Sequence, residues 1–171
     1  LFSDTQNFIN ESKQYSTFDI FLSHSYLDKE AVKGLFIDLS EKGFKVYLDW
    51  IVDPNLDRSN VTKESAELIR SRMKSSKSLL LATSPNAATS KWMPWELGYV
   101  DGHTNKCAIT PVYDDSYGNP EVYQGFEYLK LYPYVKKDDF GKIQVAESSF
   151  SYVELNRFLE GEAPFLRSTR L

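Results

Sequence analysis

The residues best suited to chemistry lie in one short stretch, residues 90–99. Within five positions it contains Trp92, Trp95 and Glu96, two aromatic rings and a carboxylate. Proline is favoured at the first position of a helix, where its missing N–H has no partner to lose, so Pro94 predicts a helix start. Glu96 is then expected in the first helical turn, where the helix dipole favours an ionised carboxylate by about 0.3–1 kcal/mol.

Tyr99 extends the aromatic character of this stretch. It lies four residues after Trp95, so the two rings share a face of the predicted helix beside Glu96. An ionised carboxylate walled by aromatic rings can hold a flat, cationic ligand. The alternative is a buried aromatic helix that begins with a solvated glutamate, since aromatic side chains usually belong to the core. These residues alone leave both interpretations open.

Composition limits the classes of protein that the chain can be. Its 171 residues fit one domain, and a hydrophobic fraction of 42% with 15% aromatic residues indicates a globular protein. The net charge of −4 and the lack of a basic block argue against a nucleic-acid partner. No apolar run approaches the roughly 18 residues of a membrane span. A lone cysteine, Cys107, fits a reducing compartment, and residues 1–16 lack a signal-peptide pattern. We therefore expect a cytoplasmic protein with a processed start.

The first two thirds of the chain alternate strand and helix patterns. Strands are predicted at residues 18–23, 45–49, 78–83 and 107–113, and helices at residues 29–42, 62–73 and 94–102. Gly43 is the expected end of the first helix and Asp28 its N-cap. Nearly continuous apolar strands are typical of a parallel sheet with both faces covered. We predict an α/β, flavodoxin-like fold of three layers, with a central, mostly parallel sheet and helices on both faces.

The pattern changes after Tyr113. An edge strand interrupted by Pro133 is predicted at residues 128–135, followed by a turn, a returning hairpin strand at 142–146 and a closing helix at 152–159. The expected organisation is an N-terminal extension with a short helix (1–16), one domain (17–160) with an elaborated segment (114–150), and a polar tail (161–171).

Three loops are expected to meet in one cleft. The loop after residue 23, the loop 50–60 and the segment before Pro94 all leave the carboxyl ends of strands, where parallel sheets bind ligands. That shared edge favours the functional interpretation of Glu96. The candidate ligand-contacting residues are His24, Ser25, Asp49, Trp50, Arg58, Trp92, Trp95 and Tyr99.

In their order and spacing, three segments resemble those of bacterial Toll/interleukin-1 receptor (TIR) domains. Residues 18–25 (FDIFLSHS) match the first box of the family, and residues 46–50 (VYLDW) lead into its mobile loop. Residues 90–97 (SKWMPWEL) match the Ser-x-Trp-x-x-x-Glu-Leu signature. The resemblance covers residues 18–113, with weaker support to residue 159. The long second loop and the 128–146 segment are similar to the TIR proteins of bacterial anti-phage systems such as Thoeris.

The resemblance implies one of two functions. Some TIR domains cleave NAD between nicotinamide and ribose, and others are adaptors that only assemble with further TIR domains. The family motif places the catalytic glutamate on Glu96 and the signature tryptophan on Trp92. It also implies NAD as a substrate without any cofactor, release of nicotinamide with ADP-ribose or a cyclised or conjugated form, and self-association that completes the cleft through the loop 50–60. Aromatic residues could keep the cleft dry, so we expect a cyclic or conjugated ADP-ribose, sensed by a separate effector, as a substantial product.

One carboxylate is sufficient for this reaction. A glycosidase usually needs a second carboxyl group to protonate its leaving group. The pyridinium of NAD instead departs as neutral nicotinamide, so Glu96 need only stabilise an oxocarbenium-like ribose. Any of the three tryptophans could stack on nicotinamide or adenine.

The other candidates have alternative roles. His24 and Ser25 could touch a ribose or phosphate, or His24 could bond to the backbone; Asp49 could cap its loop. Arg58 could bind a pyrophosphate or be a surface ion-pair partner. The sequence shows no metal-ligand spacing, Gly-x-Gly-x-x-Gly motif or P-loop, so we expect neither a metal nor a bound dinucleotide cofactor. A phosphoacceptor receiver domain would need an acidic cluster, and the strand ends offer only Asp49.

Overall fold

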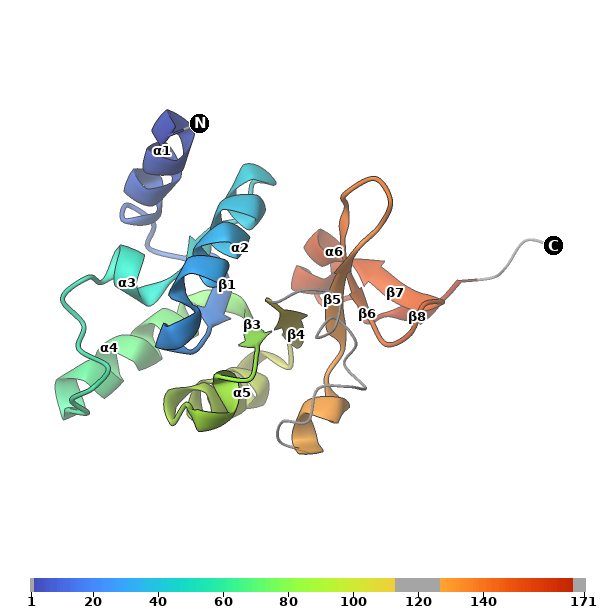
Figure 1. Cartoon of the computed structure of the whole chain (residues 1–171). Helices are drawn as coiled ribbons and strands as arrows, with labels where there is room; N and C mark the ends of the chain where they lie inside the picture. The colour runs from blue at the N-terminus through green and yellow to red at the C-terminus, as the bar shows by residue number, and fades with distance from the viewer. Residues whose placement is uncertain (1, 113–126, 168–171) are drawn as a thin grey trace.

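An eight-stranded sheet forms the centre of the computed structural model, which describes residues 2–112 and 127–167 (Figure 1). The spatial order is β2-β1-β3-β4-β5-β6-β7-β8. Strands β1 to β5 pair in parallel, and β6, β7 and β8 continue the sheet in antiparallel pairing. The strands are β1 (Phe18–Ser23), β2 (Val46–Tyr47), β3 (Ser76–Thr83), β4 (Cys107–Pro111), β5 (Tyr134–Lys137), β6 (Ile143–Ala146), β7 (Ser151–Glu154) and β8 (Phe165–Leu166).

Helices cover both faces of this sheet. The α-helices are α1 (Phe2–Ser12), α2 (Lys29–Glu41), α3 (Asp49–Val52), α4 (Lys63–Lys74), α5 (Trp92–Thr104) and α6 (Leu155–Leu159). Apolar residues of α2, α3 and α6 belong to one core cluster, and those of α4 and α5 to a second. In Figure 1, α4 and α5 accordingly lie below the sheet and α2 and α6 above it. The predicted three-layer α/β fold is confirmed.

Strand β3 shows why the central strands are apolar along their whole length. Leu79 and Leu81 pack into the cluster of α4 and α5, whereas Leu80 and Ala82 pack into the opposite cluster. Successive side chains of a strand point to opposite faces, so a strand with helices on both sides needs apolar residues at every position.

Two predicted helix boundaries are confirmed by their caps. Helix α2 ends before Gly43, whose φ of 90° is in the left-handed region that favours glycine. Helix α4 begins after Thr62, whose side chain accepts a hydrogen bond from the Ser65 backbone while the Ser65 side chain accepts one from Thr62. The predicted N-terminal helix is also present, as α1, with Phe8 and Ile9 against the core.

The predicted start of the Trp/Glu helix is wrong by two residues. Helix α5 begins at Trp92, so Pro94 is its third residue. The first four N–H groups of a helix have no partner within it, so proline is tolerated throughout the first turn and does not fix the starting residue. Glu96 therefore lies beyond the first turn, and the dipole argument for its charge fails. The helix also passes the expected end at Gly102 and stops at Asn105, whose φ is 54°.

The second predicted strand is shorter than expected. Strand β2 contains only Val46 and Tyr47, and helix α3 begins at Asp49. Asp49 and Trp50 therefore lie in a short helix, not at the end of a strand and the start of a loop. The Asp49 carboxylate accepts the Trp50 backbone N–H, which satisfies a group that the helix start leaves unpaired.

The C-terminal third also corrects two predictions. Residues 127–131 form a 3₁₀ turn, and β5 begins only after Pro133 and lies inside the sheet between β4 and β6. The hairpin of β5 with β6 is confirmed.

Helix α6 begins at Leu155, three residues later than predicted, because residues 151–154 form strand β7. Within β7, Val153 lies opposite Val145 of β6, and both are fully buried. The apolar residues of β7 and of the short helix that follows it directly have nearly the spacing of a single longer helix, which explains the wrong prediction. Part of the predicted tail, Phe165–Leu166, adds strand β8. Residues 113–126 of the elaborated segment lie outside the described residues.

None of the helices that the structure describes is long and apolar enough to span a bilayer.

Leu155 tests whether the C-terminal strands share the core of the parallel sheet. Its side chain is 1% exposed and belongs to the same cluster as Ile20 of β1. Leu155→Ala should lower the free energy of unfolding by about 2–5 kcal/mol in one cooperative transition. Denaturant titration by circular dichroism measures this. Leu166→Ala, at a position 78% exposed, is the control and should change it by less than about 0.5 kcal/mol. Two separate transitions would contradict a shared core.

Candidate active site

A cleft of about 1030 Å³ opens at the carboxyl ends of the parallel strands. Its walls come from the loop after β1, helix α3, the loop 56–61, helix α4 and the segment 89–95. The three loops predicted to meet there do so. Sites for small ligands measure roughly 300–1,000 Å³, so the cleft has room for a dinucleotide-sized molecule. Its lining includes seven predicted ligand-contacting residues: His24, Ser25, Asp49, Trp50, Arg58, Trp92 and Trp95.

Tyr99 is the predicted ligand-contacting residue outside this lining. It lies one turn further along α5, half-buried against the cluster of α4 and α5. Its ring centroid is 6.3 Å from that of Trp95, and Trp95 in turn is 5.5 Å from Trp92 in an edge-on arrangement. Tyr99 therefore supports the aromatic wall of the cleft from behind.

Glu96 lies beneath the cleft and is only 1% exposed. The Ser23 hydroxyl donates a hydrogen bond to Oε1 at 2.8 Å, and Arg58 Nη1 donates to Oε2 at 2.7 Å. Each carboxylate oxygen thus has a hydrogen-bond donor, one of them cationic, as a buried carboxylate requires. The alternative expectation of a solvated glutamate is wrong. Ser23 and Arg58 are the partners of Glu96, and the helix dipole acts only within the first turn.

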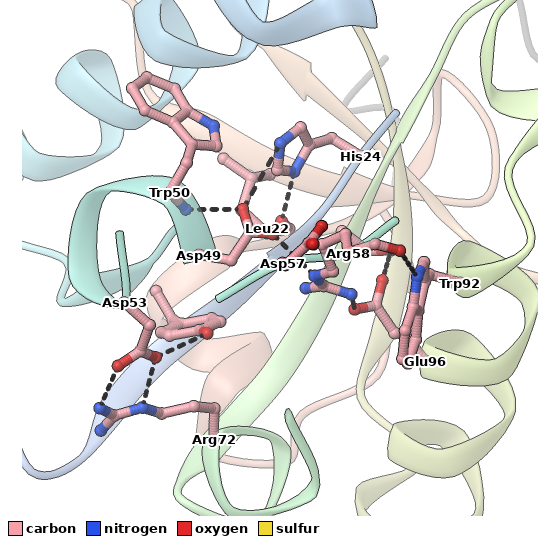
Figure 2. A network of polar contacts seen from close by, with 12 residues as sticks. Leu22, His24, Asp49, Trp50, Asp53, Asp57, Arg58, Arg72, Trp92 and Glu96 are labelled. Carbon is pink, nitrogen blue, oxygen red and sulfur yellow. Dashed lines mark hydrogen bonds and ion pairs between the residues drawn. The ribbon is translucent and has the colours of Figure 1, made fainter. Parts of the chain in front are cut away.

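Arg58 is the central residue of the site (Figure 2). Besides its bond to Glu96, its Nε donates to Asp49 Oδ2 at 2.8 Å. The guanidinium carbon lies 5.2 Å from the centre of the Trp92 ring, and the Arg58 carbonyl accepts the Trp92 indole N–H at 2.8 Å. Burial alone would lower the pKa of Arg58, but the attraction of Glu96 and Asp49 outweighs it and raises that pKa. In this conformation the guanidinium is engaged by two carboxylates, so it is neither a surface ion-pair partner nor free for a pyrophosphate.

Asp49 connects Arg58 to the loop after β1. Its Oδ1 accepts the Trp50 backbone N–H at 2.9 Å and lies 3.7 Å from His24 Nε2. The other ring nitrogen of His24, Nδ1, is 3.1 Å from the Leu22 carbonyl oxygen, which can only accept, so Nδ1 carries the proton of that bond. His24 thus contacts the backbone, as its alternative assignment expected, and also faces Asp49 in the cleft.

The loop that carries Arg58 is fixed at both ends. At its start, Asp53 accepts two hydrogen bonds from Arg72, at 2.9 and 2.7 Å, and one from the Tyr47 hydroxyl at 2.9 Å. Burial, and then the charge of Asp53, raises the pKa of Tyr47, so this hydroxyl stays a donor. At its end, Thr62 caps helix α4. Residues 54–61 therefore form a span between two anchors, which positions Arg58 over Glu96.

Asp28 holds the segment that leads into α5. It is the N-cap residue of α2, as predicted, but its side chain makes no capping bond to the helix. Its carboxylate instead accepts hydrogen bonds from the Ser84 hydroxyl and from the Asn86 side-chain amide, the latter at 2.7 Å. A carboxylate with two side-chain donors across the sheet edge fixes the loop after β3, which delivers Trp92 and Glu96 to the cleft.

Sequence reasoning missed Ser23 and the link from Asp49 through Arg58 to Glu96. Ser23 is the last residue of β1 and therefore lies at the carboxyl edge of the sheet, which was a usable signal. The link had no such signal, because nine residues separate Asp49 from Arg58 and a further 38 separate Arg58 from Glu96. Among the described residues there is no cluster of three His, Cys, Asp or Glu side chains suited to a metal ion.

Comparison with known proteins identifies relatives of the chain. A family model described as "TIR domain" matches residues 20–144. A protein of Bacillus cereus (strain MSX-D12) named "Probable 3' cyclic ADP-D-ribose synthase ThsB'" is 47% identical over 148 residues, which are 84% of this chain and 76% of the relative. A protein of Cytobacillus dafuensis named TIR2, whose name also includes the words cyclic ADP-D-ribose synthase, is 28% identical over 91 residues, 53% of this chain and 24% of that protein.

A solved structure is also similar. It is the crystal structure of the TIR domain of the Toll-related receptor TRR-2 from Hydra magnipapillata, with 19% sequence identity and a TM-score of 0.46. The match covers 57% of this chain and 73% of that one.

Arg58 should contribute strongly to stability. Its removal leaves the buried Glu96 without its cationic partner, and breaking a buried ion pair costs about 3–5 kcal/mol. Since the Arg58 side chain is 23% exposed, we expect Arg58→Leu to lower the free energy of unfolding by about 3 kcal/mol at neutral pH. Denaturant titration measures this. Arg70→Leu breaks the exposed pair with Glu67 and should cost at most about 1 kcal/mol. Equal losses in the two variants would contradict a buried pair at Glu96.

Proposed function

The chain belongs to the TIR domain family, and we propose that it is an enzyme that cleaves the bond between nicotinamide and ribose in NAD. The names of two relatives, which describe cyclic ADP-D-ribose synthases, support this proposal. The site supports it independently, because its charges and aromatic rings match the demands of that reaction.

One observation carries the proposal. A flat cation, the Arg58 guanidinium, lies over the Trp92 ring and between the carboxylates of Glu96 and Asp49. The nicotinamide of NAD is also a flat cation, bonded to a ribose. The site that holds the Arg58 guanidinium therefore has the charge and the aromatic surface to hold nicotinamide, once the loop 54–61 moves Arg58 away.

Glu96 would then act on the ribose. As the bond from ribose C1 to the pyridinium nitrogen breaks, its electron pair leaves with nicotinamide, which becomes neutral and needs no acid. Positive charge grows on C1 and the ring oxygen, and a carboxylate held in place nearby stabilises it without reorganisation. Losing one such group typically costs about 3–4 kcal/mol, or 10²–10³ in rate. Ser23 keeps Glu96 oriented throughout, because its bond does not depend on Arg58.

We further propose that a cyclic ADP-ribose is a substantial product. Trp92 and Trp95 give the cleft an aromatic wall, and a dinucleotide bound against it would be shielded from water on that side. Exclusion of water favours capture of C1 by an atom of the same molecule over hydrolysis. The name of the relative at 47% identity agrees with such a product. A small cyclic nucleotide is suited to act as a signal, sensed by a separate effector in anti-phage defence.

Glu96→Gln tests the activity. The purified protein should release nicotinamide from NAD, and the variant, which keeps the side-chain size but loses the charge, should be slower by 10² or more in kcat. Chromatography follows nicotinamide, and mass spectrometry distinguishes cyclic from linear ADP-ribose.

Glu67→Gln is the matched control, because it makes the same change on the exposed face of α4. A non-catalytic adaptor would release no nicotinamide at any concentration, and release at the same rate by Glu96→Gln would equally exclude the proposed role. Linear ADP-ribose as the only product would contradict the proposed cyclic product and would indicate that the enzyme is a hydrolase.

Self-association should control the rate. The resting loop places Arg58 on Glu96, so contacts from a second copy that withdraw the loop would activate the site. We expect the rate per molecule to rise with protein concentration, or on addition of an infection-derived trigger. Nicotinamide release measured alongside sedimentation velocity checks this. A constant rate per molecule from a persistent monomer would contradict it.

A further inference from the structure

We infer that Asp49 is a second catalytic residue, the general base that takes the proton from the hydroxyl group that captures ribose C1. The inference rests on the proposed cleavage of NAD and adds to it the step that decides the product. Cleavage alone needs one carboxylate, but capture by an O–H nucleophile also needs an acceptor for its proton.

The first support is the position of Asp49 relative to Glu96. One guanidinium bridges them, with Asp49 Oδ2 on Nε at 2.8 Å and Glu96 Oε2 on Nη1 at 2.7 Å (Figure 2). Two nitrogens of one guanidinium share a carbon atom, so these oxygens lie no more than about 8 Å apart. Enzymes that place an attacking oxygen between two carboxyl groups on either side of a sugar hold them about 6.5–9.5 Å apart. The two carboxylates therefore lie close enough together to act on one ribose and its nucleophile.

The second support is that withdrawal of Arg58 frees Asp49 as well as Glu96. Oδ2 of Asp49 has Arg58 as its hydrogen-bond donor, while Oδ1 stays with the Trp50 backbone N–H, which fixes the carboxylate at the start of α3. Asp49 lines the cleft, whereas Glu96 lies beneath it. The two carboxylates would thus face the substrate from different sides.

The chemistry balances with the groups present. The bond from C1 to the pyridinium nitrogen breaks with its electron pair on nicotinamide, and the bond from C1 to the attacking oxygen forms with the electron pair of that oxygen. The proton of the attacking hydroxyl passes to Asp49 and from there to solvent. His24 Nε2 lies 3.7 Å from Asp49 Oδ1, beside the carboxylate that takes the proton. The products are nicotinamide, the ring-closed or hydrolysed ADP-ribose and one proton.

The other carboxylates near the cleft are less suited. Asp57 lines it but is exposed and accepts two hydrogen bonds from Ser59. Asp53 is held by Arg72 and Tyr47 at the anchor of the loop. Asp49 is the remaining carboxylate of the described cleft lining that is buried and directed at Arg58.

The test compares two nucleophiles on the same enzyme. Capture of C1 by a hydroxyl or by water releases a proton, whereas capture by the ring nitrogen of 3-acetylpyridine, which exchanges nicotinamide for another pyridine, releases none. Asp49→Asn should lower hydroxyl capture by 10²–10⁴ and pyridine exchange by about tenfold or less. Glu96→Gln should lower both by 10² or more. Chromatography of nicotinamide, the exchanged dinucleotide and ADP-ribose products gives both rates from one mixture.

Two control variants distinguish a general base at Asp49 from a residue that only positions Arg58. Asp57→Asn, the same change in the same cleft, should leave the ratio of the two rates as it is, and Asp49→Glu should restore part of the hydroxyl capture. If both rates of Asp49→Asn fall or rise together, Asp49 only positions Arg58 and the inference is overturned. If the wild-type protein releases no nicotinamide, the proposed function is contradicted, and not only the role of Asp49.

Solvent isotope effects extend the test to the unmodified protein. In D₂O, hydroxyl capture should slow relative to pyridine exchange, since only the former moves a proton in its product-forming step. An unchanged ratio of the two products would overturn the inference even where Asp49→Asn does not fold.

Discussion

The electrostatic bridge from Asp49 through Arg58 to Glu96 is the interaction on which the site depends. A carboxylate that is 1% exposed loses its hydration, and an unpaired charge in that position would cost several kcal/mol. Glu96 is tolerated there because Arg58 and Ser23 replace the lost water with a cation and a hydroxyl donor. The loop therefore has to fold back over the sheet edge, and its anchors at Asp53 and Thr62 serve that requirement.

The arrangement of the sheet explains why three distant segments supply this bridge. Strands β1, β2 and β3 are parallel neighbours, so the residues that follow each of them emerge at one edge. Ser23 ends β1, Asp49 is the second residue after β2, and the chain after β3 turns past Asn86 into α5. The antiparallel strands at the other side of the sheet contribute no residue to the lining of the cleft.

Sequence patterns predicted the features that depend on periodicity and missed those that depend on tertiary contact. The apolar run of β3 and the end of α2 at Gly43 are local, and both were predicted. Pro94 was misleading because a proline is compatible with any residue of the first helical turn. Glu96 was identified from its aromatic neighbours and then from a family motif. Its burial was not predicted, since its partners Ser23 and Arg58 lie far away in the chain.

In the proposed function Arg58 mimics the charge of the substrate, so binding and activation are coupled. NAD and Arg58 would then compete for Glu96, and the apparent affinity for NAD would be reduced in proportion to the fraction of molecules whose loop is open. A contact that stabilises the open loop by 1.4 kcal/mol would raise that fraction about tenfold while it remains small. Under this proposal, the cation that lets a buried carboxylate exist in the resting protein also keeps that carboxylate from the ribose of NAD. The stability and the inactivity of the resting state would then come from one interaction, so a change that strengthens one would strengthen the other.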